Sequence, residues 1–205
     1  MNLERLYTAE AVFLDRYPGG FEHPDIVEIG KKHRVGAIAE RTQELLAEQK
    51  FANQGEVLDS IVKTVSRSSM VSLFEKPKFR DYVAGLRRGD RARLAEGFRQ
   101  MFHADQAAGF DIVLDLLVDG KLAKWSLMTI CLLYLRPEEE VFVKPTTTKR
   151  IISYLELDEF VYKPRPSWAF YERYRTTIND MKGLVSPDLG PNNAAFTGFL
   201  MMTLE

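Results

Sequence analysis

Residues 117–155, LVDGKLAKWSLMTICLLYLRPEEEVFVKPTTTKRIISYL, contain the stretch that decides the fold. From Ala123 to Leu135, only Lys124, Ser126 and Thr129 interrupt the apolar side chains, so a helix formed here has no face left for water. Such a helix lies inside a folded domain. Because a bilayer crossing needs roughly 20 apolar residues, the segment predicts a central core helix and no membrane span.

On either side of this segment, hydrophobic residues recur at helical spacing. Phe110, Val113, Leu114 and Leu117, for example, follow the i, i+3, i+4, i+7 pattern of an amphipathic helix. Alternation typical of strands is almost absent, and only residues 141–143 suggest a brief extended piece. The sequence therefore predicts an all-α fold, a compact multi-helix domain around the central apolar helix (123–135).

No repeat or low-complexity segment marks a domain boundary. We expect a single domain over residues 1–205, with a subdivision between N-terminal helices (1–104) and a second helical half (105–205) as the alternative. The final Leu204-Glu205 pair is compatible with a non-native tail, and no prediction rests on it.

The chain has 205 residues, one cysteine and a formal net charge of −1. That length buries a sizeable core without disulfides, and Cys131 lies in the apolar segment, where it is expected to be an inert packing residue. The N-terminal residues lack the basic and apolar regions of a signal peptide. A cytoplasmic protein with no membrane partner is expected.

The near-zero charge argues against non-specific coating of nucleic acid, but the charge is uneven. The segment from Lys76 to Arg99 holds the largest local surplus of basic residues. The ordinary interpretation of such a run of charged residues is a surface exposed to solvent. The basic residues are Lys76, Lys78, Arg80, Arg87, Arg88, Arg91, Arg93 and Arg99, against the acids Asp81, Asp90 and Glu96.

The segments flanking the core helix resemble the helix-hairpin-helix element of the DNA glycosylase superfamily, over about 40 of the 205 residues. That family has a Leu-Pro-Gly-x-Gly-x-Lys-Thr-Ala hairpin before an apolar helix, and an Asp-Thr-His-Val-x-Arg stretch opening the next. The matching residues here are Leu117, Gly120, Lys124, Ser126, Thr146, Arg150 and Leu155. The resemblance implies a degenerate hairpin that binds a nucleic-acid backbone.

In such a hairpin, glycines let backbone amides approach a phosphate at a helix N-terminus without contacting a base. Two departures limit the resemblance. Leu122 stands at the second glycine, and Pro145 stands at the family's aspartate, although Lys124 takes the place of the nucleophilic lysine of bifunctional members. Without the carboxylate, base excision is not expected, and no catalytic residue is predicted.

A second resemblance involves residues 116–150 together with 162–168. These runs are similar to segments of uncharacterised bacterial proteins, some of them near restriction systems, which implies no activity. The alternative for the whole stretch is a helical hairpin that only packs against its neighbours, with Thr146 or Thr147 capping a helix.

The functional prediction is non-catalytic binding to the phosphate backbone of DNA or RNA, with no cofactor or metal. The predicted contacts around the core helix are Gly120, Lys121, Lys124, Thr146, Thr147, Lys149 and Arg150, widened by Arg87, Arg88 and Arg91.

Other candidate sites have simpler interpretations. Asp111, Asp115 and Asp119 recur every four residues, opposite the apolar stripe, and are expected to be solvated acids rather than metal ligands. Asp119-Gly120-Lys121 is similar to the end of a restriction-nuclease motif, which requires a strand that this helical neighbourhood lacks. The histidines His23, His33 and His103 have no metal-ligand spacing.

Two further classes of function stay open. The aromatic segment at 168–174 is interpreted as core rather than a base-stacking surface. In an interaction module or homo-oligomer, it would instead form an exposed patch of Trp168, Tyr171, Phe196 and Phe199. An enzyme would require carboxylates or histidines brought together from distant helices.

Overall fold

The computed structural model describes residues 1–204, and Glu205 lies outside the described residues. No strand occurs within residues 1–204, which confirms the all-α prediction, and residues 141–143 form a buried irregular segment. The helices are α1 (Leu3–Arg16), α2 (Pro24–His33), α3 (Val35–Leu45), α4 (Gln54–Arg67), α5 (Glu75–Gly85), α6 (Arg88–His103), α7 (Gln106–Asp119), α8 (Trp125–Leu135), α9 (Pro145–Tyr154), α10 (Trp168–Lys182) and α11 (Asn193–Thr203), with short 3-10 turns η1 (Gly20–Glu22), η2 (Glu48–Ala52) and η3 (Pro187–Leu189).

Helix α8 is the predicted core helix, and every side chain from Trp125 to Leu135 is buried. The helix begins two residues later than expected because Lys124 takes the extended backbone of an N-cap residue. Its polar groups are satisfied internally: the Thr129 hydroxyl donates to the carbonyl of Trp125 at 2.8 Å, and the Tyr134 hydroxyl donates to Ser68 Oγ at 2.9 Å. These bonds remove the cost of burying hydroxyl groups.

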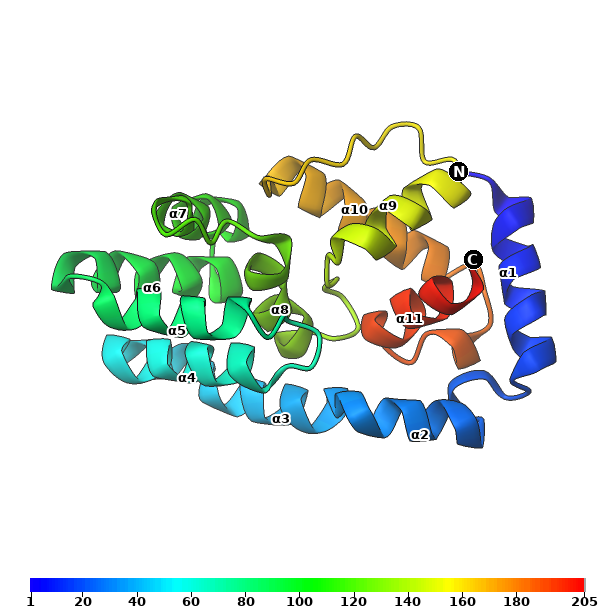
Figure 1. Ribbon diagram of the computed structural model, residues 1–205, viewed down its shortest axis with the longest axis horizontal. Coiled ribbons are helices and arrows are strands. Elements are labelled where there is room, and N and C mark those ends of the chain that lie inside the picture. The colour runs from blue at the N-terminus through cyan, green and yellow to red at the C-terminus, as the bar shows by residue number, and fades with distance from the viewer. Residues whose placement is uncertain (205) are drawn as a thin grey trace.

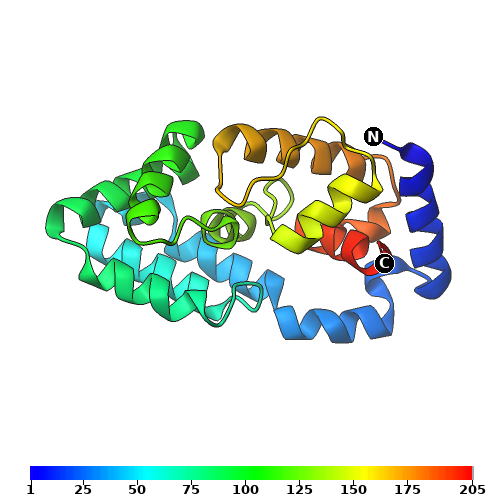
Figure 2. The same ribbon diagram turned by 45° about the horizontal axis from the view of Figure 1, so that its top comes forward.

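The helices form two lobes with α8 between them (Figures 1 and 2). One lobe contains α3 to α7, and α8 packs against α3, α4 and α7. The other contains α1 and α9 to α11. Helices α2 and α3 run along one side of both lobes, joined at Arg34, whose φ of 49° is left-handed. Within residues 1–204, no helix is long and apolar enough to span a bilayer.

The two ends of the chain meet in the second lobe. The amide of Asn2 donates to the carbonyl of Leu155 at 2.8 Å, and the rings of Phe13 and Phe199 lie 5.3 Å apart, edge to face. The subdivision at residues 104 and 105 therefore does not follow the lobes. It would also separate α6 from α7, which pack closely against each other.

The aromatic residues of the C-terminal helices are core residues, as the favoured interpretation held. Tyr171, Phe196 and Phe199 are each 0% exposed, and Trp168 is half-buried. The expected patch for an oligomer interface is therefore wrong, because these side chains pack within the chain. Leu204 is 5% exposed and belongs to the core cluster.

Candidate functional site

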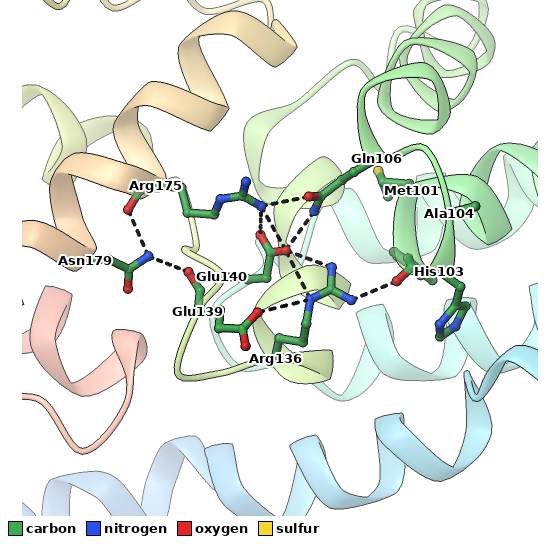
Figure 3. Close-up of a pocket in the computed structure, with 10 residues that line it drawn as sticks. Met101, His103, Ala104, Gln106, Arg136, Glu139, Glu140, Arg175 and Asn179 are labelled. Atoms are coloured by element: carbon green, nitrogen blue, oxygen red, sulfur yellow. Dashed lines mark hydrogen bonds and ion pairs between the residues drawn. The ribbon is translucent and has the colours of Figure 1, made fainter.

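The most concentrated group of polar side chains surrounds Glu140, which is 1% exposed. Its carboxylate lies between the guanidinium groups of Arg136 and Arg175 (Figure 3). Arg136 Nη2 donates to Oε1 at 2.8 Å, and Arg175 Nη1 donates to both oxygens at 3.1 Å. Gln106 Nε2 and the Tyr171 hydroxyl each donate at 2.7 Å. We call these five residues the Glu140 clasp.

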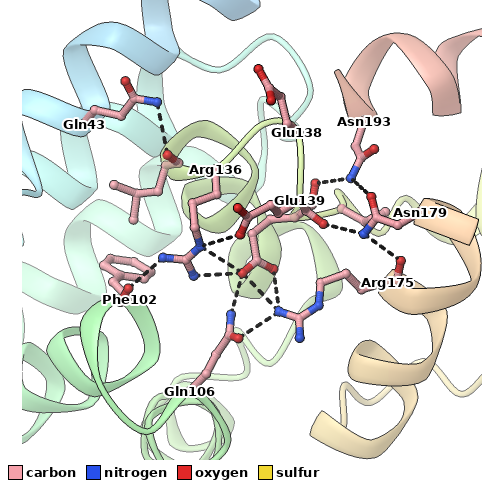
Figure 4. A network of polar contacts seen from close by, with 12 residues as sticks. Gln43, Phe102, Gln106, Arg136, Glu138, Glu139, Arg175, Asn179 and Asn193 are labelled. Carbon is pink, nitrogen blue, oxygen red and sulfur yellow. Dashed lines mark hydrogen bonds and ion pairs between the residues drawn. The ribbon is translucent and has the colours of Figure 1, made fainter. Parts of the chain in front are cut away.

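The clasp joins elements that are distant in the sequence. Gln106 opens α7, Arg136 follows α8, and Tyr171 and Arg175 come from α10. The network extends through the loop after α8, where Asn193 donates to the carbonyl of Glu140 at 3.2 Å (Figure 4). Glu140 therefore fixes α10 of the second lobe against α7 and α8.

The surroundings keep Glu140 ionised. Burial raises the pKa of this carboxyl, but hydrogen bonds from Tyr171 and Arg136 and the charge of Arg175 outweigh burial, so the pKa lies below its ordinary value. Burial and the adjacent carboxylate hold the pKa of Tyr171 well above its usual range, so its hydroxyl remains a donor. A carboxylate occupied on both oxygens and of lowered pKa is a poor general base and no general acid at neutral pH.

A cavity of about 490 Å³ lies beside the clasp, lined also by His103 and Glu139. Two carboxylates, Glu139 and Glu140, and the histidine His103 thus line one cavity, which is the arrangement that the enzyme alternative requires. The His103 ring points away from Glu140, however, and its Nε2 is 2.7 Å from the carbonyl of Leu46. No cluster of three metal-ligating side chains occurs in residues 1–204. The geometry fits a structural ion-pair network.

Sequence inspection missed the clasp. No functional role was predicted for Glu138, Glu139 or Glu140, and the last of them is buried. The available signal was the position of Glu140, directly before the apolar run 141–143. An acid bordering such a run is pulled toward the interior by its neighbours and then requires partners.

The predicted hairpin lies between α7 and α8. The amides of Lys121, Leu122 and Lys124 donate to carbonyl oxygens of residues 117–122. Leu122 is 4% exposed, and Gly120 packs so closely on the Tyr82 ring that an added Cβ would lie 2.6 Å from it. These amides are thus not available to a phosphate. Lys121 has a left-handed φ of 55°, and the side chains of Lys121 and Lys124 are exposed.

At the start of α9, the predicted residues separate into two groups. Thr146, Lys149 and Arg150 are exposed, whereas Thr147 is 8% exposed and faces a cavity. Thr148, which was not predicted, is also buried.

The start of α8 and the exposed part of α9 meet through the loop at 155–167. The Trp125 indole N–H donates to the carbonyl of Lys163 at 2.8 Å, and Lys149 Nζ lies 5.8 Å from the centroid of the Tyr162 ring. Three lysine-bearing segments are thereby brought together. We call Lys124, Lys149 and Lys163 the lysine cluster; all three are exposed, and none forms an ion pair with another side chain of residues 1–204.

The arginines of α6 differ in their surroundings. Arg91 Nη1 donates to the carbonyl of Val83 at 2.8 Å, and its Nη2 is 3.9 Å from Asp59, so this side chain holds α4, α5 and α6 together. Arg87 and Arg88 are exposed at the start of α6. Of the three, only Arg91 has a structural role.

The acids of α7 and the cysteine have the surroundings that the sequence predicted for them. Asp111, Asp115 and Asp119 are exposed. Cys131 is buried, and burial raises the pKa of its thiol to about 12, so the reactive thiolate does not form at neutral pH.

The geometry defines an all-helical protein with a buried ionic clasp and a separate exposed lysine cluster. Comparison with protein-family models, with curated proteins and with solved structures finds no match to this chain.

Proposed function

We propose that the chain binds nucleic acid without catalysis, through side chains around the start of α8. The observation that carries the proposal is the lysine cluster, whose members come from three segments and have no acidic partner. Lysine side chains bind phosphate as point charges and do not depend on base sequence.

The proposed contacts are side chains and not amides. The hairpin amides are already bonded within the chain, so the glycine-rich mode of the resembled family has no support here. Glu75 lies near the start of α8, where its Oε2 accepts from the Ser126 hydroxyl at 2.6 Å. The loop at 155–167 also carries Glu156, Asp158 and Glu159, and of these Glu156 pairs with Arg5 at 2.9 Å.

An exposed aromatic ring lies beside the same region. Phe74 is 80% exposed and Leu73 is 78% exposed, and Phe74 directly precedes Glu75. An aromatic ring in that position stacks on an unpaired base, which adds on the order of 1–3 kcal/mol per base in single-strand binders. The proposal therefore favours single-stranded over duplex nucleic acid.

The test is fluorescence anisotropy of labelled single-stranded DNA, single-stranded RNA and duplex DNA at a series of salt concentrations. We expect affinity to fall steeply with salt and to be insensitive to sequence. Lys124→Gln and Lys149→Gln should each reduce the logarithmic salt slope by about 0.7 on single strands. Phe74→Ala should weaken single-strand binding without changing that slope.

Lys32→Gln is the matched control. Lys32 is exposed and unpaired, on α2, which lies on the opposite side of the molecule from the loop at 155–167 (Figures 1 and 2). Its substitution should leave binding unchanged. Absence of binding to all three probes at low salt, or an equal loss in Lys32→Gln and Lys149→Gln, would overturn the proposal.

A further inference from the structure

A second cavity, of about 450 Å³, opens between α2, α9 and α11, away from the Glu140 clasp. Its volume lies within the usual range of small-molecule sites, roughly 300–1,000 Å³. Most of its wall is apolar. Ile26 and Ile29 line it from α2, Phe142 from the segment before α9, and Ala195 and Met202 from α11.

The cavity wall carries permanent charge of one sign only. Lys144 is the single permanently charged side chain that lines the cavity, and no aspartate or glutamate lines it. Lys144 is exposed and forms no ion pair within residues 1–204. The histidine of the wall, His33, has its Nδ1 2.9 Å from Ser69 Oγ. An apolar cavity with one cation is complementary to an apolar molecule with one negative charge.

Helix α9 begins at the cation. Lys144 is its N-cap residue and provides no side-chain cap, and Pro145 follows. The amides of Thr146 and Thr147 therefore have no partner within the helix, and the helix dipole favours an anion there.

Thr147 provides a second polar group on this wall. The residue is 8% exposed and lines the cavity. A hydroxyl group that borders a cavity can donate a hydrogen bond to an acceptor of a bound ligand. Thr148 and Tyr174 line the same wall.

We propose that this cavity binds an amphipathic carboxylate, with the carboxylate at Lys144 and Thr147 and the hydrocarbon chain between α2 and α11. The volume corresponds to a ligand on the order of 15 heavy atoms, at about 30 Å³ each. A medium-length fatty acid meets this size. A single cation matches the single charge of a carboxylate better than the higher charge of a phosphate monoester.

Isothermal titration calorimetry with decanoate tests the site, with 1-decanol and decyl phosphate as the matched probes. We expect decanoate to bind at least tenfold more tightly than decanol, because both fill the apolar wall and only decanoate meets the cation. Lys144→Met should weaken decanoate binding about tenfold and leave decanol binding unchanged. Thr147→Val should weaken decanoate binding by a smaller factor, about threefold.

Two further variants make the test specific. A Cβ added at Gly198 would meet only Phe21 Cζ, at 3.8 Å, so Gly198→Leu fills the cavity and should abolish binding of both decanoate and decanol. Lys63→Met, at an exposed lysine of α4 that does not line the cavity, should bind decanoate as the wild type does.

Equal affinities for decanoate and decanol, tighter binding of decyl phosphate, unchanged binding in Lys144→Met, or no binding of decanoate would each overturn the proposal. The result is independent of nucleic-acid binding, because Lys144 is not a member of the lysine cluster.

Discussion

Three consecutive glutamates, at 138–140, show how one residue acquires a role that its neighbours lack. Glu139 is 74% exposed in its side chain, and Glu140 is 1% exposed. The peptide turns after Pro137 so that only the last acid points inward, between two arginines. Removing a buried charge that pairs with two half-buried arginines costs far more than removing a solvated charge.

We therefore expect Glu140→Gln to lower the free energy of unfolding by about 3 kcal/mol, because Arg136 and Arg175 lose their shared counter-charge. Urea denaturation at pH 7 measures this difference. Glu139→Gln is the matched control and should change stability by less than about 0.5 kcal/mol. Similar values for the two variants would show that the clasp does not stabilise the fold.

The clasp also predicts a pH dependence. The folded-state pKa of Glu140 lies below its ordinary value of 4.5, so the unfolded chain takes up a proton first as the pH falls. The stabilisation is complete above pH 4.5 and is lost as the pH falls through the folded-state pKa. Denaturation curves should therefore show the wild type and Glu140→Gln converging in stability below pH 4.5, with a constant difference from pH 5 to 7. A constant difference at pH 3 would contradict this assignment.

Among the helices, the contact of α6 with α7 depends on a glycine. A Cβ built on Gly109 would collide with the backbone of Met101, and an alanine therefore cannot fit without separating the helices. Glycine at such a crossing permits a backbone approach that no other residue allows. Gly97 on α6 adds to this close approach, because a Cβ built there would lie 2.7 Å from Ile112 Cγ2 of α7.

Gly109→Ala should lower the free energy of unfolding by about 2 kcal/mol through overpacking. Gly89→Ala is the control within α6, because nothing lies within 4 Å of a Cβ added there. That variant should keep or slightly raise stability, since alanine favours helix more than glycine does. Thermal denaturation followed by circular dichroism distinguishes the two. Equal melting temperatures would show that the helices separate without cost.

At the scale of the whole molecule, the first and last helices share one lobe. Helix α1 packs against α11, and the side chain of Arg5 pairs with Glu156 at 2.9 Å. The packing of this lobe therefore joins segments from the two ends of the described residues 1–204. The core is continuous across the lobes, and we expect the protein to unfold in one cooperative step.

Phe13→Ala should lower the free energy of unfolding by about 3–4 kcal/mol, because Phe13 is 1% exposed and contacts the ring of Phe199. Val12→Ala, at a side chain that is 56% exposed, should cost less than about 0.5 kcal/mol. Tryptophan fluorescence and circular dichroism should give coincident transitions. Separate transitions would mean that the lobes unfold independently.

The sequence by itself determined the helical class and the centre of the fold. A segment without a polar face has only one stable environment, so residues 125–135 had to form the core helix whatever surrounded them. Asp111, Asp115 and Asp119 were correctly predicted to be solvated, because they lie opposite an apolar stripe on the same helix. Periodicity within one helix is local and needs no knowledge of the partner.

Only the tertiary structure decided which polar residues meet. Glu140 binds Gln106 and Arg175, which lie 34 and 35 residues away in sequence, and Lys149 approaches the start of α8 only through the loop at 155–167. Tyr171 is a core residue and Trp168 is half-buried because α7 packs against both: the ring of Phe110 lies 5.7 Å from that of Trp168 and 5.9 Å from that of Tyr171. The residues adjacent in sequence determine whether a side chain lies in a helix. Its burial and its hydrogen-bond partners depend on segments that are distant in sequence and that the fold brings close.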